Sequence, residues 1–112
     1  MGIAVQTLDG VYGRPAASVR ARIEHAGSGQ WLVETKAETD HEGRVREWRG
    51  RKFDRGLYRI VFESDRYFAA LGLVAAYPEI VVMFRIQDDS DACQIQVLLS
   101  TYSYSAYFGS LG

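Results

Sequence analysis

Apolar and polar residues alternate with a period of two along most of this 112-residue chain. Such alternation predicts strands that bury one face and turn the other away from the core. In the third of these strands we expect Trp31, Val33, Thr35 and Ala37 to point inward. The expected strands cover residues 4–8, 18–25, 31–38, 58–62, 79–86, 92–100 and 103–108, with a short edge strand within 44–55.

One helix is expected between the strands. Ser64 can cap its start, Asp65 suits its first turn, and Gly72 ends it. About eight strands with one short helix predict an all-β fold, a two-sheet antiparallel β-sandwich. The length fits one domain over residues 1–112.

Composition narrows the functional classes. The net charge is −1, whereas a dedicated nucleic-acid surface needs a surplus of Lys and Arg. The basic segment 44–55 is open to two interpretations, a solvated strand edge or a phosphate-binding patch. The longest apolar runs are too short to span a membrane, and we see no secretory signal. The single cysteine, Cys93, cannot form an internal disulfide, and we expect a cytoplasmic protein.

Three strands carry a second face that differs from an ordinary solvated one. Amide, hydroxyl and isolated apolar groups line these faces, where Lys and Glu would be usual. The faces hold Gln6 and Leu8 in the first strand, Gln94, Gln96 and Leu98 in another, and Ser103, Ser105 and Tyr107 in the last. We interpret them as walls of a partly enclosed, uncharged space, although Gln94 and Gln96 can also be read as simple surface residues.

Several short motifs follow one another along the chain. They are Leu8-Asp9, Gly13-Arg14-Pro15-Ala16, Tyr67-Phe68-Ala69-Ala70-Leu71-Gly72, Tyr77-Pro78-Glu79, Leu98-Leu99-Ser100, Tyr102-Ser103-Tyr104-Ser105 and Tyr107-x-Gly109-Ser110. In order and spacing they resemble the transthyretin/5-hydroxyisourate hydrolase family, nearly from end to end. The resemblance implies an eight-stranded transthyretin-like sandwich that pairs at its edges into a dimer. Two dimers would form a homotetramer around a channel that binds a small molecule.

The resemblance also locates departures from the hydrolase pattern. Hydrolases of the family carry a histidine three residues before the Asp of Leu-Asp, where this chain has Gln6. They carry a second one at the place of Gln94. The arginine of their Asp-Gly-Arg loop is kept as Arg44, at the channel mouth, whereas Phe108 replaces a second arginine. Leu111-Gly112 extend past the serine that ends the family's signature.

These departures bear on catalysis. Opening the ring of 5-hydroxyisourate requires water to lose a proton near neutral pH, and histidine, with an ordinary pKa of about 6.5, suits that role. Glutamine cannot titrate. Because losing a general base typically costs about 10²–10⁴ in rate, we expect little or no 5-hydroxyisourate hydrolysis.

The function expected from the sequence is therefore a non-hydrolytic enzyme. It would fold a largely apolar molecule for cyclisation or cycloaddition in natural-product biosynthesis, without a cofactor or metal. Candidate hydrogen-bond donors are Gln6, Gln94 and Tyr107, and the ligand-binding residues are Leu8, Arg44, Gln96, Leu98 and Ser105. Two alternatives stay open: a small-molecule carrier of the transthyretin type and a residual 5-hydroxyisourate hydrolase. His25 and His41 have no further ligand at metal-binding spacing, and we expect both to be solvated.

Overall fold

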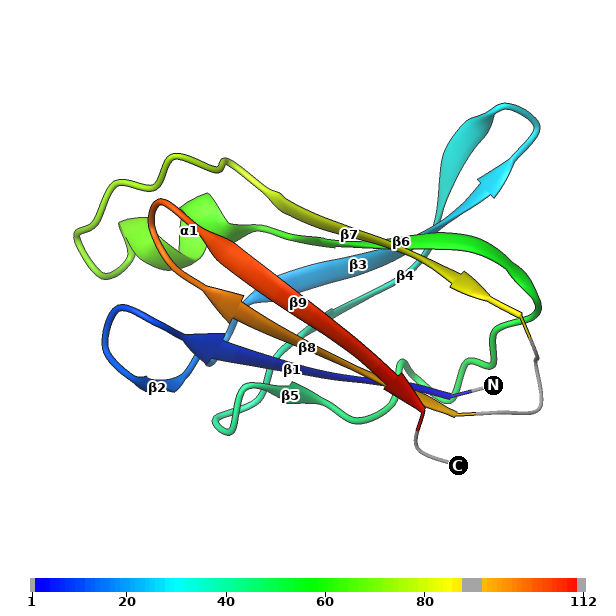
Figure 1. Ribbon diagram of the computed structural model, residues 1–112, viewed down its shortest axis with the longest axis horizontal. Helices are drawn as coiled ribbons and strands as arrows, with labels where there is room; N and C mark the ends of the chain where they lie inside the picture. The colour runs from blue at the N-terminus through cyan, green and yellow to red at the C-terminus, as the bar shows by residue number, and fades with distance from the viewer. Residues whose placement is uncertain (1, 88–91, 111–112) are drawn as a thin grey trace.

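Two β-sheets pack face to face in the computed structural model, which describes residues 2–87 and 92–110 (Figure 1). One sheet has the order β2-β1-β8-β9, with β5 also paired to β1, and the other has the order β4-β3-β6-β7. The first sheet contains β1 (Ile3–Asp9), β2 (Arg14–Pro15), β5 (Arg44–Val45), β8 (Cys93–Leu99) and β9 (Tyr104–Ser110). The second contains β3 (Arg20–Gly27), β4 (Gln30–Glu38), β6 (Gly56–Phe62) and β7 (Ile80–Ile86). The predicted all-β sandwich is confirmed; the extension at 111–112 lies outside the described residues.

The pairing of β1 with β8 organises the first sheet. These strands run parallel over their whole length, from Ile3 beside Cys93 to Asp9 beside Leu99. The neighbouring pairs β1–β2, β1–β5 and β8–β9 are antiparallel. Alternation in the sequence predicts which face of a strand a side chain lies on, but it does not predict whether the neighbouring strand runs parallel or antiparallel. The parallel β1–β8 pair could therefore not be predicted from the sequence.

The inner faces of both sheets form one hydrophobic core. The basic segment 44–55 contributes three of its members, since Val45, Trp48 and Phe53 are 5%, 1% and 2% exposed. The indole N–H of Trp48 donates to the backbone oxygen of Ile3, 3.0 Å away. The bond from Trp48 fixes the segment against β1, while four of its five arginines stay exposed and Arg44 is half-buried.

A β-bulge overturns part of the prediction for β4. Ile23 faces Thr35 but Glu24 faces Val33, so Glu34 is an extra residue in β4. Beyond the bulge the alternation reverses: Thr35 is buried as expected, whereas Val33 is 53% exposed. Trp31 likewise leaves the core, and its ring carries the guanidinium of Arg59 at 4.4 Å. The inward placement of Trp31 and Val33 was wrong.

The helix begins at the residue that was predicted to cap it, one position earlier than expected. Helix α1 spans Ser64–Ala69, and Glu63 is the residue before it. Ser64 does not cap the helix, because its hydroxyl donates to the backbone oxygen of Tyr77 at 2.9 Å. Gly72, with φ of 75°, follows the helix end as expected. Within the described part of the chain, no helix is long and apolar enough to cross a membrane.

Candidate functional site

One transverse row of polar side chains crosses the outer face of the first sheet. Gln6 in β1 faces Arg44 in β5 on one side and Gln96 in β8 on the other. Gln96 in turn faces Tyr107 in β9. We call Arg44, Gln6, Gln96 and Tyr107 the central row. Because it takes one residue from each of four strands, chain positions a hundred residues apart meet in a single line.

The other predicted site residues lie in the two flanking rows of the same face. On one side, Leu8 faces Leu98, which faces Ser105. On the other side, Ala4 faces Gln94, which faces Gly109. The register therefore brings all eight predicted site residues to one face. Ser103 is different, because it precedes β9 and is not part of the strand.

A direct hydrogen bond joins the two strands at the centre of the row. The side-chain nitrogen Nε2 of Gln96 donates to Oε1 of Gln6 at 2.9 Å. The sequence placed Gln94 as the counterpart of Gln6, but Gln94 lies one row away. The parallel register makes Gln96 the neighbour. A paired amide still has free donors and acceptors, so this pair can hydrogen-bond a polar ligand on either side.

A tight turn places Arg44 at one end of the row. Asp40 Oδ1 accepts the backbone N–H groups of Glu42 and Arg44, each at 2.9 Å. These bonds, that of Arg44 first, lower the pKa of the Asp40 carboxyl. Gly43 has φ of 76°, and a Cβ there would lie 2.3 Å from the backbone oxygen of Thr7. Only glycine lets the turn approach β1 so closely, and the approach fixes Arg44 beside Gln6.

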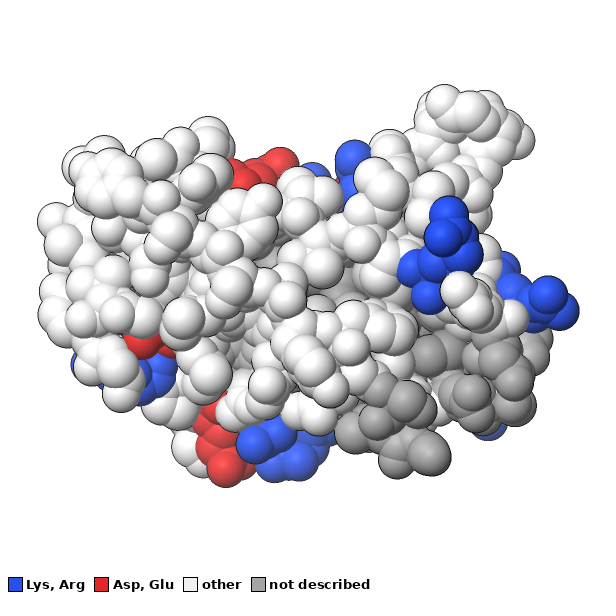
Figure 2. Space-filling model, viewed as in Figure 1, with Lys and Arg blue, Asp and Glu red and all other residues white. Residues whose placement is uncertain are grey.

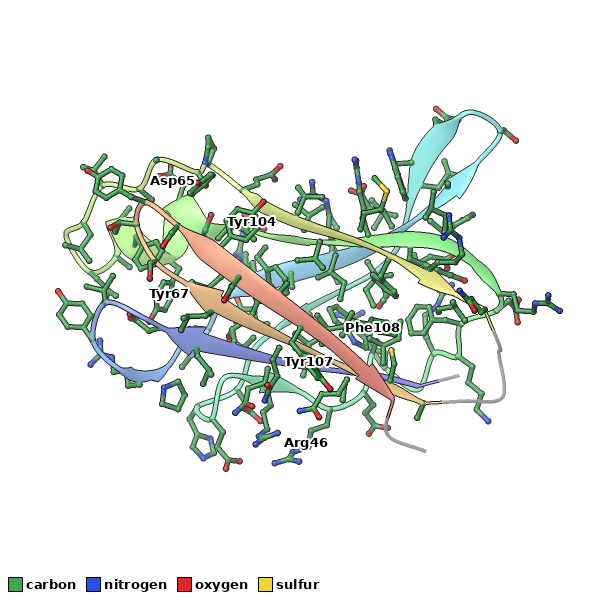
Figure 3. The ribbon with its side chains drawn as sticks, viewed as in Figure 1. Arg46, Asp65, Tyr67, Tyr104, Tyr107 and Phe108 are labelled. Carbon is green, nitrogen blue, oxygen red and sulfur yellow. The ribbon has the colours of Figure 1, made fainter. Side chains whose placement is uncertain are left out.

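Tyr107 ends the row at the opposite edge. Its ring lies along β9 toward Gly109, so that a Cβ on Gly109 would lie 2.7 Å from Cε1 and 2.8 Å from the hydroxyl oxygen of Tyr107. Glycine at this outward position therefore leaves room for the phenol. The next side chain, Phe108, takes the other face of β9, where its ring lies 5.7 Å from that of Phe84 (Figure 3). Of these two aromatic residues, only Tyr107 contributes to the candidate site.

The face is nearly free of charge over β8 and β9. Figure 2 shows uncharged surface there, with acidic and basic groups below β5 and others at the outer edges of the view, including the end near β2. Within the central row Arg44 is the one ionic side chain, and the other three are amide or phenol groups. Such a face can bind a flat polar molecule through hydrogen bonds and stabilise negative charge near Arg44. None of the four side chains of the central row is a histidine, the one type whose ordinary pKa lies between 5 and 8, although His41 lies in the turn that precedes Arg44.

Comparison with known proteins decides the family. The model of the HIUase/Transthyretin family matches residues 3–109. The chain belongs to this family. Its relatives include the 5-hydroxyisourate hydrolase of Salmonella typhimurium, 33% identical over 109 residues, which are 96% of this chain and 80% of that protein. The 5-hydroxyisourate hydrolase of Caulobacter vibrioides is 33% identical over 115 residues, 97% of this chain and 98% of that protein.

Solved structures of family members have the same fold. Sea bream transthyretin in complex with thyroxine superposes with a TM-score of 0.90 at 25% identity, covering 98% of this chain and 96% of that one. The 5-hydroxyisourate hydrolase of Klebsiella pneumoniae superposes with a TM-score of 0.86 at 22% identity, covering 98% and 100%. At that identity the second match speaks for the fold alone.

The relatives overturn the function predicted from the sequence. Proteins 28–33% identical over nearly the whole chain, from bacteria to Mus musculus, are 5-hydroxyisourate hydrolases. A cyclase in natural-product biosynthesis has no support among them, and neither has the expected lack of hydrolase activity. The prediction of a non-hydrolytic enzyme relied on two residues, Gln6 and Gln94, and gave too little weight to the similarity of the whole chain.

Sequence reasoning also missed Gly109 as a site residue. Its role follows from the ring of Tyr107 lying over its Cα, which alternation does not reveal. One signal was present: Gly109 lies two residues after Tyr107, and residues two apart in a strand share a face.

Proposed function

We propose that this protein is a hydrolase that opens the ring of 5-hydroxyisourate or a closely related cyclic ureide. The observation that carries the proposal is the central row, a line of amide, guanidinium and phenol groups on the face that the parallel β1–β8 pair creates. A cyclic ureide alternates N–H donors and C=O acceptors along its edge. The Gln6–Gln96 pair and Tyr107 offer matching acceptors and donors.

Arg44 has the electrostatic role in this proposal. When water adds to a ring carbonyl carbon, negative charge develops on the carbonyl oxygen, and a fixed cation stabilises it. Arg44 is held in place for this by the turn at residues 40–43. The paired amides of Gln6 and Gln96 would hold the ring so that its carbonyl lies toward Arg44.

Such a site works by positioning and electrostatics, without a titrating general base. In the sequence resemblance, Gln6 and Gln94 stand where hydrolases of the family have histidines. Since a general base typically contributes about 10²–10⁴ in rate, we expect a slower hydrolase than histidine-containing members. The remaining acceleration comes from holding water and substrate in a reactive geometry.

We propose further that the site is completed in an assembly, a homotetramer made of two dimers. The outer face of the first sheet is open to solvent in a single chain, with Leu98 43% and Tyr107 63% exposed. β9 is the last strand of its sheet and exposes Tyr104 and Phe108 by 41% and 45%. An exposed aromatic edge strand is a template for pairing with a second copy, and a second sheet packed over the outer face would enclose the central row.

The test follows decay of 5-hydroxyisourate, generated by urate oxidase, through its absorbance. We expect the wild type to exceed the spontaneous rate, and Gln96→Ala and Arg44→Gln to lose about tenfold or more. Gln30→Ala, an exposed amide in β4 on the other sheet, is the matched control and should behave as wild type. Decay at the spontaneous rate with folded wild-type protein would refute the hydrolase proposal.

A carrier is the second candidate, favoured by one observation. Leu8 and Leu98 lie side by side in the row next to the central row, so the same face can also contact the apolar part of a ligand. The related sea bream transthyretin is known in complex with thyroxine. Stoichiometric binding of a ureide or aromatic ligand that is recovered unchanged would support this alternative.

A further inference from the structure

We infer that Arg46 joins Arg44 to form a carboxylate-binding site at the β5 end of the central row. The site would hold the carboxylate that ring opening creates. This inference rests on the proposed function for its biological meaning, but the binding it describes can be measured independently of turnover.

The geometry starts from the alternation along β5. Arg44 lies on the outer face beside Gln6, and Val45, beside Val5, is buried in the core. Arg46 is the next alternate residue, which the period of two assigns to the outer side again, and Figure 3 shows it at the β5 edge of the sheet, below Tyr107 in the view. Two guanidinium groups therefore lie at the β5 end of the face, next to β1.

Both guanidinium groups have donors to spare. Nε of Arg44 is buried without a hydrogen-bond partner among the described residues. A buried, unpaired donor of a charged group is costly, and a bound acceptor would relieve that cost. Arg46 makes an ion pair with Glu42 at 3.3 Å, but the two side chains are 65% and 53% exposed. An ion pair so open to water is weak, so a ligand carboxylate can displace Glu42.

The charge balance at this edge explains why the site would select a carboxylate that fits it and would not bind every anion. Asp40 and Glu42 offset the two arginines, so the edge has little net charge for unspecific anions. Oδ1 of Asp40 is occupied by two backbone N–H groups, whereas Glu42 contacts Arg46 through its side chain. Glu42 is thus an internal competitor for the ligand, and removing its charge should strengthen binding.

The reaction supplies a suitable ligand. The oxygen of water bonds to a ring carbonyl carbon, the C–N bond breaks, and one proton of the water passes to the leaving nitrogen. The new carboxylic acid releases its remaining proton to solvent near neutral pH and becomes a carboxylate. Arginine binds carboxylates through paired N–H donors, so the site would recognise the opened product better than an uncharged ring.

The experiment uses two stable probes, hydantoin, an uncharged cyclic ureide, and ureidoacetate, its ring-opened carboxylate. Affinities are measured by calorimetric titration with wild type, Arg46→Gln, Glu42→Gln and the control Lys52→Gln, an exposed cation of the same segment. We expect Arg46→Gln to weaken ureidoacetate about tenfold, Glu42→Gln to tighten it a few-fold, and Lys52→Gln to change nothing. Hydantoin should respond to neither of the first two variants.

The outcomes separate this inference from the proposed function. Unchanged ureidoacetate affinity in Arg46→Gln, or equal losses in Lys52→Gln, would overturn the carboxylate site even if the wild type hydrolyses 5-hydroxyisourate. The expected pattern in a protein without hydrolase activity would establish the site and refute the reaction. Circular dichroism tests that each variant is folded, which we expect because all three substituted side chains are at the surface.

Discussion

Gly43 is the residue on which the geometry of the candidate site depends most. Its φ of 76° is unfavourable for any other residue, and a Cβ would meet the backbone of Thr7, which cannot move aside without breaking the β1–β5 pairing. The neighbouring hydrogen bond from Thr7 N to Gly43 O is 2.7 Å long. Position 44 is thus held by backbone contacts, not by its own side chain.

We predict that Gly43→Ala lowers the free energy of unfolding by roughly 2 kcal/mol or more, from strain plus the clash. Gly13→Ala is the matched control, because Gly13 has φ of 67° but nothing within 4 Å of the added Cβ. That variant should lose only about 1 kcal/mol, from backbone strain alone. Urea denaturation measures both; equal losses would show that the close approach of the turn to β1 is unimportant.

At the scale of elements, the second sheet carries a buried ion network on its outer face. Glu24 in β3 is 5% exposed and accepts from Nε of Arg22 at 2.6 Å and Nε of Arg59 at 2.5 Å. Burial acts to raise the pKa of Glu24, but the hydrogen bonds and charges of the two arginines outweigh it and leave that pKa below its ordinary 4.5. The network joins β3 to β6, and Trp31 of β4 covers Arg59.

Glu24→Gln should therefore destabilise the protein by about 1–3 kcal/mol at pH 7, because it leaves two partly buried arginines short of a counter-charge. The native pKa is depressed, so the contribution is present above about pH 4.5 and is lost as the pH falls through the native value. The stability gap between wild type and variant should narrow over that acidic range. Glu38→Gln, in an exposed pair with Arg20 at 3.4 Å, is the control and should cost less than about 1 kcal/mol. A gap that stays constant down to pH 3 would contradict this account.

The elements also show what alternation can and cannot predict. Seven of the longer strands were found within a few residues, because each keeps one apolar face. The bulge at Glu34 was not predicted, because one extra residue reverses the faces of Trp31 and Val33 without any local change in composition. The parallel β1–β8 register was equally invisible, and it decides that Gln96, not Gln94, lies against Gln6.

At the scale of the whole molecule, the sequence predicted that the candidate residues share a face, but it did not predict which of them are neighbours on that face. The uncharged second faces of β1, β8 and β9 do lie together, which the composition of each strand predicted. Reading function from substituted residues failed, because a change at two positions does not tell which of several contributions to catalysis remains. In the proposed function, positioning and electrostatic stabilisation come from the entire face, through Arg44 and the paired amides of Gln6 and Gln96.

The central claim is that the central row hydrolyses 5-hydroxyisourate without a titrating base. Its most direct test is the pH dependence of the catalysed rate, after subtraction of the spontaneous rate, for wild type and Gln6→Ala. We predict catalysis that rises smoothly between pH 5.5 and about 8, with no inflection near the ordinary histidine pKa of about 6.5, and that is largely lost in Gln6→Ala. A bell-shaped profile, or catalysis unaffected by Gln6→Ala, would contradict the account.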